Sequence, residues 1–363
     1  MRKILICLLS ISGLVACNGG SSSSSGGSET NLLLSCLPSV PANSSAMTKL
    51  MQPGSSLKIY GGCNTNESAM SLVQQMTVAL SKYNSTTSAY SSACSATPIK
   101  STANGNGSYT NWVLTAAHCF EGGSKAANAP VTADNFPLIN LPNDNANVSI
   151  FSGISPFAGG NNPLMTIESI FVPADYCYQY AFNDNGQCGH TGDSSHDIAL
   201  LKTTSNTPLD IVVQLASEYP SVNSLISQSG YGRTTAAGSD YGTLFYDTAY
   251  YMGHGLIYST NGDVDQLYTV NDFSYQGGYG YVGTTCHGDS GSGVFYYQNN
   301  QWYVFGDLAA LRTNYCGTVY DYNLVQNISD GVSVYTDVIK FKPWIESIIA
   351  TDSCTTNCVE SSI

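Results

Sequence analysis

Short apolar runs that end at polar or turn-forming residues constrain the fold of this chain more than any other feature. Clear examples extend from Trp112 to Ala117 and from Ile198 to Leu201. The chain is also rich in Gly and Tyr, with 35 and 25 residues, while only 10% of its residues are charged. Such a composition suits many short strands joined by turns better than it suits helices. The sequence therefore predicts an all-β protein.

The N-terminus has the features of an export signal. Two basic residues precede an apolar run, residues 4–15, which is too short to span a membrane as a stable helix. The sequence Leu-Val-Ala-Cys that ends at Cys17 resembles the lipobox of bacterial lipoproteins, in which the Cys becomes the lipidated first residue. An ordinary signal peptide with an incidental Cys is the alternative. We interpret residues 1–17 as a signal peptide with a lipobox and expect an exported protein, an outer-membrane or cell-surface lipoprotein that could also be released.

A segment of Ser and Gly follows the signal. Residues 18–30 consist almost entirely of these two residue types, which cannot bury a core and behave as a flexible tether. We expect residues 18–58 to form a tether and pro-segment ahead of the folded body. The net charge of −13 would repel nucleic acid and anionic lipid surfaces, so the sequence predicts membrane contact only through a lipid anchor and no nucleic-acid partner.

The cysteine content also fits an exported protein. Of twelve cysteines, an even ten remain once Cys7 is removed with the signal and Cys17 is lipidated. An even number in this compartment indicates disulfides. No Cys-x-x-Cys sequence is matched by a second one or by paired His residues, so neither a zinc site nor another cofactor is predicted.

A Gly-Asp-Ser-Gly sequence gives the strongest functional signal. It lies within Thr284–Gly293 and places Ser290 between glycines. Hydrolysis of an amide needs an activated hydroxyl and backbone N–H donors for the developing oxyanion, and glycines let the backbone approach a substrate carbonyl closely. Because the same four letters also occur in ordinary loops, the assignment needs partner residues.

Two further polar residues lie where apolar runs begin or end. His118 follows the run that starts at Trp112, so a strand would hold it in place, although a single His here is more often a buried structural residue. Asp197 opens the run Ile198–Leu201, where a lone Asp would ordinarily cap the start of a strand. Together with Ser290 they supply the base, the orienting carboxylate and the nucleophile of acyl transfer.

Three segments in this chain order resemble the trypsin/chymotrypsin family of serine proteases. Thr-Ala-Ala-His-Cys, Asp-Ile-Ala-Leu-Leu and Cys-x-Gly-Asp-Ser-Gly match the family's three signatures. Residues 229–234 resemble a further family segment, with Tyr231 where Trp is usual, and residues 334–349 resemble its final strand and helix. The resemblance implies a fold of two antiparallel six-stranded β-barrels with a C-terminal helix over residues 59–350. Residues 351–363 remain as a Cys-containing tail.

The family resemblance also implies roles for individual residues. Ser290 would attack the scissile carbonyl, His118 would act as general base and then general acid, and Asp197 would orient the imidazole. The amides of Gly288 and Ser290 would form the oxyanion hole. Three disulfides are implied on the same grounds, between Cys94 and Cys119, Cys286 and Cys316, and Cys177 and Cys188.

Residues 58–62, Lys-Ile-Tyr-Gly-Gly, resemble the activation site of the same family. Cleavage after Lys58 would free the ammonium of Ile59, which would pair with a buried Asp289 and order the oxyanion hole and the specificity pocket. Loss of one partner from such a buried pair costs about 3–5 kcal/mol, so the chain would be an inactive zymogen until it is cut. A Gly-Gly turn after a basic residue is the alternative interpretation.

The primary specificity pocket is implied to be shallow and neutral. Its floor falls on Thr284, six residues before the nucleophile, and a neutral hydroxyl cannot pair with Lys or Arg. Alignment to the family places Leu311 and Ser333 where glycines open the pocket in trypsin, with Thr285 and His287 nearby. We therefore expect a preference for small or medium uncharged side chains. For His287, simple exposure to solvent is the alternative.

Two consequences follow for the pro-segment. If Thr284 excludes Lys, the enzyme cannot activate itself after Lys58, and a separate trypsin-like protease must cut it. By elimination, Cys36 and Cys63 remain as a pair across the cut, and a bridge between them would keep the activated enzyme on its anchor.

The resulting hypothesis is a serine endopeptidase that acts on protein or peptide substrates. The main alternative is a catalytically inactive protease fold that serves as a surface adhesin or binding protein. An esterase with the same triad is a third reading, but the sequence lacks the Gly-x-Ser-x-Gly elbow typical of such enzymes.

Overall fold

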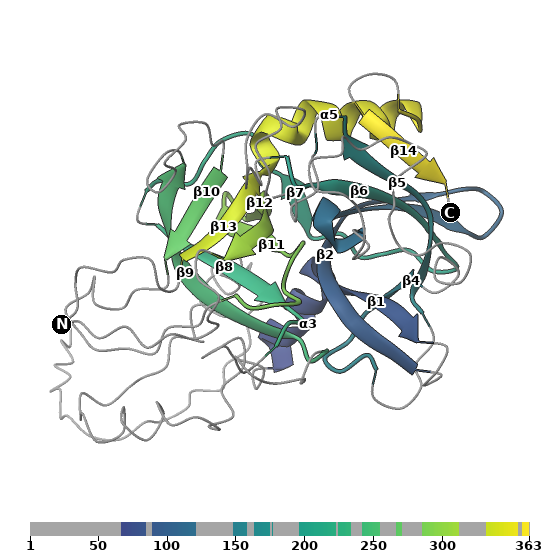
Figure 1. Ribbon diagram of the computed structural model, residues 1–363, viewed down its shortest axis with the longest axis horizontal. Helices are drawn as coiled ribbons and strands as arrows, with labels where there is room; N and C mark the ends of the chain where they lie inside the picture. The colour runs from purple at the N-terminus through teal and green to yellow at the C-terminus, as the bar shows by residue number, and fades with distance from the viewer. Residues whose placement is uncertain are drawn as a thin grey trace, which may run out of the picture.

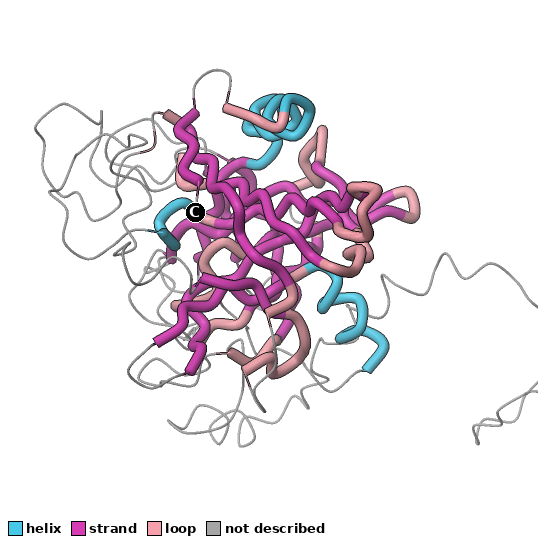
Figure 2. The backbone as a smooth tube through the Cα atoms, turned by 90° about the vertical axis from the view of Figure 1, so that its right-hand side faces the viewer, coloured by secondary structure: helices cyan, strands magenta, loops and turns pink. Residues whose placement is uncertain are grey.

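The computed structural model describes the segments that carry the predicted triad. Within the described residues, strands predominate, and Figure 1 shows them arranged as two groups that lie side by side. Figure 2 shows the helices on the outside of this body of strands. The described residues are 67–84, 89–120, 148–157, 163–174, 176, 196–222, 224–233, 242–254, 266–270, 285–311, 332–354 and 358–362.

The first sheet closes into a six-stranded antiparallel barrel. Its strands follow the order β14-β5-β4-β1-β2-β3-β6, and β5 also pairs with β6, which closes the ring. The strands are β1 (Val78–Asn84), β2 (Ala89–Ala103), β3 (Tyr109–Thr115), β4 (Val148–Phe151), β5 (Met165–Pro173), β6 (Ala199–Ser205) and β14 (Cys358–Ser362).

The apolar run before His118 forms β3, and both faces of this strand are buried. Trp112 and Leu114 join an apolar cluster that contains residues of both sheets, while Val113 between them joins the cluster inside the barrel. Successive side chains of a strand point to opposite faces. Trp112, Val113 and Leu114 are therefore all apolar because the two faces of the strand pack against different cores.

The second sheet contributes the strands on the other side of this shared cluster. Its order is β11-β8-β9-β10-β13-β12-β7, and β11 also pairs with β12. The strands are β7 (Val213–Leu215), β8 (Leu225–Gly230), β9 (Phe245–His254), β10 (Gln266–Val270), β11 (Gly293–Gln298), β12 (Gln301–Leu311) and β13 (Val332–Asp337).

Helix α5 (Val338–Thr351) follows β13 directly. The side chain of Asp337 accepts hydrogen bonds from the backbone N–H groups of Ile339 and Lys340, which caps the N-terminus of the helix. Its buried side chains join the cluster shared by both sheets, and they are Val338, Ile345 and Ile348.

A second helix, α3 (Glu67–Met76), precedes β1 and is absent from the expectations drawn from sequence. Met70, Val73 and Met76 bury one side of it in the same shared cluster. Their spacing of three residues is a helical pattern that could have revealed it. Neither helix in the described part of the chain is long and apolar enough to cross a membrane.

The predicted all-β fold, with a closed six-stranded barrel and a C-terminal helix, is confirmed. The second barrel stays a prediction, although β11 pairs with both β8 and β12. The division of the chain into a signal, a pro-segment, a protease domain and a tail also stays a prediction.

The C-terminal tail adds a strand to the first sheet. β14 pairs with β5 from Cys358 opposite Pro173 to Ser362 opposite Ser169, and Val359 packs against the core of the barrel. A disulfide joins Cys354 to Cys358. The tail therefore covers an edge of β5 that would otherwise be open.

Removal of residues 354–363 is expected to lower the free energy of unfolding by about 1–3 kcal/mol, because it exposes a strand edge and apolar core surface. The unfolding midpoint in urea at neutral pH measures the effect. Substitution of the exposed Thr351 by Ala provides a control with an intact tail. Identical midpoints for the truncated and full-length chains would contradict the role of β14.

Candidate active site

His118 lies on a short 3-10 turn, η1 (Ala117–Phe120), that follows β3 after one intervening residue. The turn begins where the barrel strand ends, and Cys119 N donates to the carbonyl of Ala116 over 3.2 Å. A disulfide then joins Cys119 to Cys94 on β2, with the two Cα atoms 6.1 Å apart. The imidazole is thus carried on a backbone fixed from both sides.

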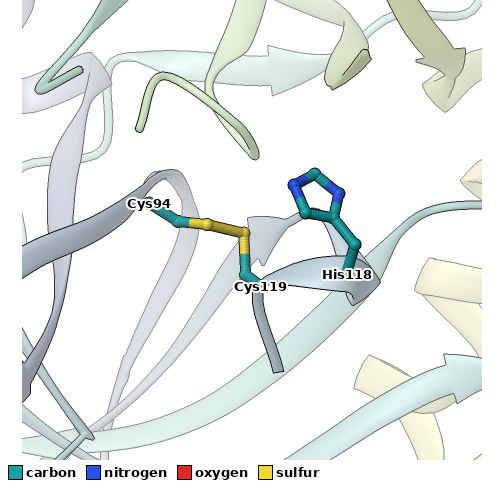
Figure 3. Close-up of side chains that lie close together, drawn as sticks. All are labelled: Cys94, His118 and Cys119. Carbon is teal, nitrogen blue, oxygen red and sulfur yellow. A yellow bond between two sulfur atoms is a disulfide. The ribbon is translucent and has the colours of Figure 1, made fainter. Parts of the chain in front are cut away.

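Figure 3 shows the His118 ring beside this disulfide. The donor atoms of Cys94, His118 and Cys119 lie within 4.8 Å of one another, a spacing that resembles a metal site. The two sulfur atoms are bonded to each other, however, so neither is available as a thiolate ligand. This cluster is a positioning device for His118.

Asp197 contacts both the backbone and the ring of His118. It lies just before β6, and its carboxylate is fully buried. One carboxylate oxygen accepts the backbone N–H of His118 at 2.9 Å, and the other lies 2.6 Å from the ring atom Nδ1. Because an ionised carboxylate only accepts hydrogen bonds, Nδ1 carries the proton and Nε2 is left as the basic nitrogen.

The segment around Ser290 is fixed to both sheets by its backbone. The Ser290 carbonyl accepts the N–H of Ser95 on β2 at 2.8 Å, and Gly291 N donates to the carbonyl of Leu308 on β12 at 2.8 Å. The Sγ atom of Cys119, the residue after His118, lies 3.8 Å from the Ser290 carbonyl oxygen. The structure therefore brings the Ser290 loop against the turn that carries His118.

Two glycines of this loop adopt backbone conformations that other residues avoid. Gly288 has φ of +95° and Gly291 has φ of +79°. A Cβ atom on Gly291 would lie 2.0 Å from the Thr115 hydroxyl oxygen, so this position also has no room for a side chain. Ser95 donates its hydroxyl proton to the Gly288 carbonyl over 3.0 Å and fixes the peptide there.

Asp289 is completely buried beside Ser290. Its carboxylate accepts the backbone N–H groups of Gly232 at 2.7 Å and Cys286 at 2.8 Å. Burial raises the pKa of Asp289 to about 7, and these two hydrogen bonds oppose the shift. Asp289 therefore keeps its proton to a higher pH than an exposed aspartate does.

Gly230 and Gly232 provide the space that the Asp289 side chain occupies. A Cβ atom would lie 2.1 Å from the Asp289 carboxylate at Gly230 and 2.6 Å from it at Gly232. Real Cβ atoms do not approach other atoms so closely, and the Asp289 side chain is enclosed. An alanine at either position must displace the acid.

Gly232→Ala is expected to destabilise the chain by about 1–3 kcal/mol through overpacking and, by moving the Ser290 loop, to abolish the peptide hydrolysis predicted from sequence. Thermal unfolding and an assay of that predicted hydrolysis together measure both effects. Gly105→Ala is the control: it has a φ of +74° but no atom within 4 Å of its Cβ, so it tests backbone strain without crowding. A Gly232→Ala protein with normal activity would contradict the close packing around Asp289.

The structure places some of the predicted pocket residues in contact with one another. The hydroxyls of Thr285 and Ser333 are both buried and lie 2.7 Å apart. Leu311 is the strand partner of Ser333 in the pairing of β12 with β13. His287 is exposed, its carbonyl accepts the N–H of Arg233 at 2.8 Å, and partial burial followed by the Arg233 charge lowers the pKa of its imidazole.

The remaining predicted residues lie outside the described part of the chain. Cys286 is disulfide-bonded, but Cys316 is outside the described ranges. The other predicted residues outside the described ranges are Cys17, Lys58, Ile59, Cys177, Cys188 and Thr284, together with Cys36 and Cys63. Their assignments stay predictions.

Two residues of the site were missed by sequence reasoning. Ser95 links three segments, since its hydroxyl donates to Gly288 and accepts the N–H of Tyr231 at 2.9 Å. Asp307 is a fully buried acid on β12. A charged residue within the apolar run Val304–Leu311 was the available signal for the second; nothing in the sequence distinguishes Ser95 from other serines.

Comparison with models of protein families gives a match. Residues 181–345 match the family model described as Trypsin. The match includes Asp197 and Ser290 and begins after His118. No curated protein sequence matches the chain.

Proposed function

Because this chain carries a trypsin-family serine protease domain, we propose that it is an endopeptidase with Ser290 as nucleophile, His118 as general base and Asp197 as the orienting carboxylate. The observation that carries the proposal is the His118–Asp197 pair, with Nδ1 2.6 Å from a buried carboxylate, set against the loop of Ser290.

The proposed reaction proceeds through an acyl-enzyme. Nε2 of His118 takes the Ser290 hydroxyl proton as Oγ bonds to the scissile carbonyl carbon, and the imidazolium then gives this proton to the leaving amine. Water, activated by the same imidazole, releases the acyl group and restores the hydroxyl. Asp197 stabilises the imidazolium throughout without taking its proton.

The amides of Gly288 and Ser290 are proposed to bind the oxyanion. The support is the peptide geometry of this loop, with a positive φ at Gly288 and its carbonyl held by Ser95. Backbone donors fixed in this way need no reorganisation as charge develops, and each contributes about 3–4 kcal/mol of transition-state stabilisation.

Activation by cleavage after Lys58 is proposed to work through Asp289. In the uncut chain this carboxyl is enclosed, and the groups that hydrogen-bond to it in the described structure are neutral backbone amides. A new ammonium group from Ile59 would ionise it and pair with it, and the pair would fix the adjacent Ser290 loop. A separate trypsin-like protease would make the cut.

The uncut chain is expected to lose stability as the pH rises from about 4 to about 7. In this window the folded chain keeps a proton on Asp289, whose pKa is raised from 3.8 to about 7, while the unfolded chain has released it. The folded state binds more protons, so stability falls with pH. Urea unfolding at several pH values measures the slope, and Asp289→Asn should make it shallower without removing it, because burial also raises the pKa of Asp307. The same slope in both proteins would contradict the raised pKa.

We further propose a neutral primary pocket that takes small or medium uncharged side chains. The hydroxyl pair of Thr285 and Ser333 supports it, since these groups satisfy each other and add no charge. The exported, lipid-anchored location and the pro-segment bridge are proposed from sequence alone. Protein or peptide substrates follow from the family.

A peptide library incubated with the trypsin-treated chain tests the endopeptidase proposal. Trypsin is removed with an inhibitor that does not act on neutral pockets, and cleavage after uncharged residues is the expected result. Asp197→Asn should suppress it, and Asp210→Asn, a substitution of an exposed aspartate, should not. Intact peptides with correctly processed protein would favour the inactive, adhesin-like alternative.

A further inference from the structure

One buried acid of the described chain has no role in the proposed mechanism. Asp307 on β12 is 1% exposed, and neither of its carboxyl oxygens has a hydrogen-bond partner among the described residues. An ionised carboxylate without partners in a protein interior is very unfavourable. Burial without hydrogen-bond partners therefore favours the protonated, neutral form of Asp307.

The strand pairing places Asp307 beside the triad. Asp307 is the register partner of Thr336 on β13, and cross-strand partners lie on the same face of a sheet. The hydroxyl of Thr336 donates to the Asp197 carbonyl at 2.9 Å. The Asp307 side chain consequently faces the segment that carries Asp197.

Its neighbour in the chain is bonded to the nucleophile loop. Leu308 accepts the N–H of Gly291 and donates to the carbonyl of Ser292, each over 2.8 Å. Leu308 itself packs into the core of the second sheet, so alternation along the strand turns Asp307 the other way, toward the first sheet. Asp307 is thus held between the two segments that carry Asp197 and Ser290.

Few charged groups face this position from the elements packed against β12. Strands β3, β7 and β11 carry no Asp, Glu, Lys or Arg, and Asp337 on β13 is directed to the N-terminus of α5, which it caps. The Asp289 carboxylate is turned to Gly232. The charged residues of α5 are at the surface and are Lys340, Lys342 and Glu346.

The charge that bears on Asp307 is that of Asp197. Burial, and then the Asp197 charge, raise the pKa of Asp307 well above its ordinary value. Two adjacent buried carboxyls do not both ionise, and the one with donors keeps the charge. Asp197 has the donors, from His118 N and Nδ1.

We propose that Asp307 is a positioning residue for the triad: a neutral carboxylic acid whose side-chain dipole faces the Asp197 carboxylate and sets how strongly that carboxylate attracts the His118 proton. This inference rests on the proposed protease function. The dipole stabilises the negative charge of Asp197, so it weakens the attraction for an imidazolium and keeps His118 a base at neutral pH.

Two substitutions separate this role from simple space filling. Asp307→Asn keeps a neutral dipole of the same shape, and Asp307→Leu keeps the volume but removes the dipole. The acidic limb of kcat/KM against pH reports the ionisation of the free enzyme's base. It should stay in place for Asn and move to higher pH by about half a unit for Leu, the size expected from a weak hydrogen-bond-like interaction.

Opposite results would overturn the proposal. A limb that moves to lower pH in Asp307→Asn would mean that Asp307 is charged in the native enzyme. A limb that stays in place in a folded Asp307→Leu protein would mean that Asp307 only fills space. Asp210→Asn, in an exposed position, is the control and should move nothing.

Infrared spectroscopy tests whether the Asp307 side chain is protonated, and it does not depend on an assay of enzyme activity. The processed Ser290→Ala protein, in which the Ile59 ammonium would ionise Asp289, should show a protonated carboxylic acid band at neutral pH that is lost when Asp307→Asn is added. Absence of this difference overturns the proposal even if the Leu variant fails to fold. If the band is present but the processed wild-type chain cleaves no peptide, the protease function fails while the neutral acid stands.

Discussion

Ser290→Ala is expected to lower kcat for peptide hydrolysis by at least about 10⁴-fold. In the proposed mechanism the Oγ atom of Ser290 bonds to the scissile carbonyl carbon, and without the hydroxyl the imidazole of His118 has nothing to deprotonate. KM should change little, because the specificity pocket and the backbone donors of Gly288 remain. Progress curves with a cleaved peptide ester and amide measure both constants in the processed protein.

Loss of activity in Ser290→Ala identifies the nucleophile only if the variant keeps the native fold. Ser290 is only partly buried, and the loop is held by its backbone bonds to Ser95 and Leu308, so removing the hydroxyl leaves those bonds intact. Ser108→Ala, which removes the hydroxyl of a partly exposed residue on the turn between β2 and β3, is the matched control. A Ser290→Ala enzyme within tenfold of wild type would assign the nucleophile to another residue.

Lys58→Gln is expected to leave the chain inactive after treatment with trypsin, with at least about a 100-fold lower rate than the processed wild type. Without the cut there is no ammonium for Asp289, and loss of one partner of a buried ion pair costs about 3–5 kcal/mol, where each 1.36 kcal/mol is tenfold in rate. Hydrolysis of a neutral peptide before and after trypsin measures the switch.

A matched substitution distinguishes loss of the cut from loss of a lysine. Lys342→Gln removes a lysine paired with Glu346 at 2.7 Å on the surface of α5, where such pairs contribute little to stability. It should activate like the wild type, and its new N-terminus should begin with Ile59. Full activity of uncut Lys58→Gln protein would rule out the zymogen mechanism.

Local sequence patterns predicted the strands because the apolar pattern that marks a buried strand lies within that strand's own residues. The run that forms β3 must be apolar on both faces, and the spacing of Phe341, Ile345 and Ile348 fits the helix that was found. Helix α3 has a comparable pattern but was overlooked. Closure of the barrel through β5 and β6 could be predicted only from the family resemblance, because the sequence of one strand does not specify its pairing with a strand far away in the chain.

The site shows the same division between motif and environment. His118, Asp197 and Asp289 could be found because each belongs to a short motif. The importance of Ser95 and Asp307 depends on what distant segments place beside them, such as Thr336 opposite Asp307. Sequence alone gives their identity but not their neighbours, so the buried acid near Asp197 emerged only from the structure.

Reaction with a fluorophosphonate, followed by mass spectrometry of the labelled peptide, tests the central assignment most directly. The reagent bonds to a serine only when a neighbouring base has activated its hydroxyl. After cleavage behind Lys58 we expect one adduct on Ser290, reduced strongly in His118→Ala and absent from the uncut chain. An adduct on a different serine, or equal labelling of Ser290 in the His118→Ala protein, would contradict it.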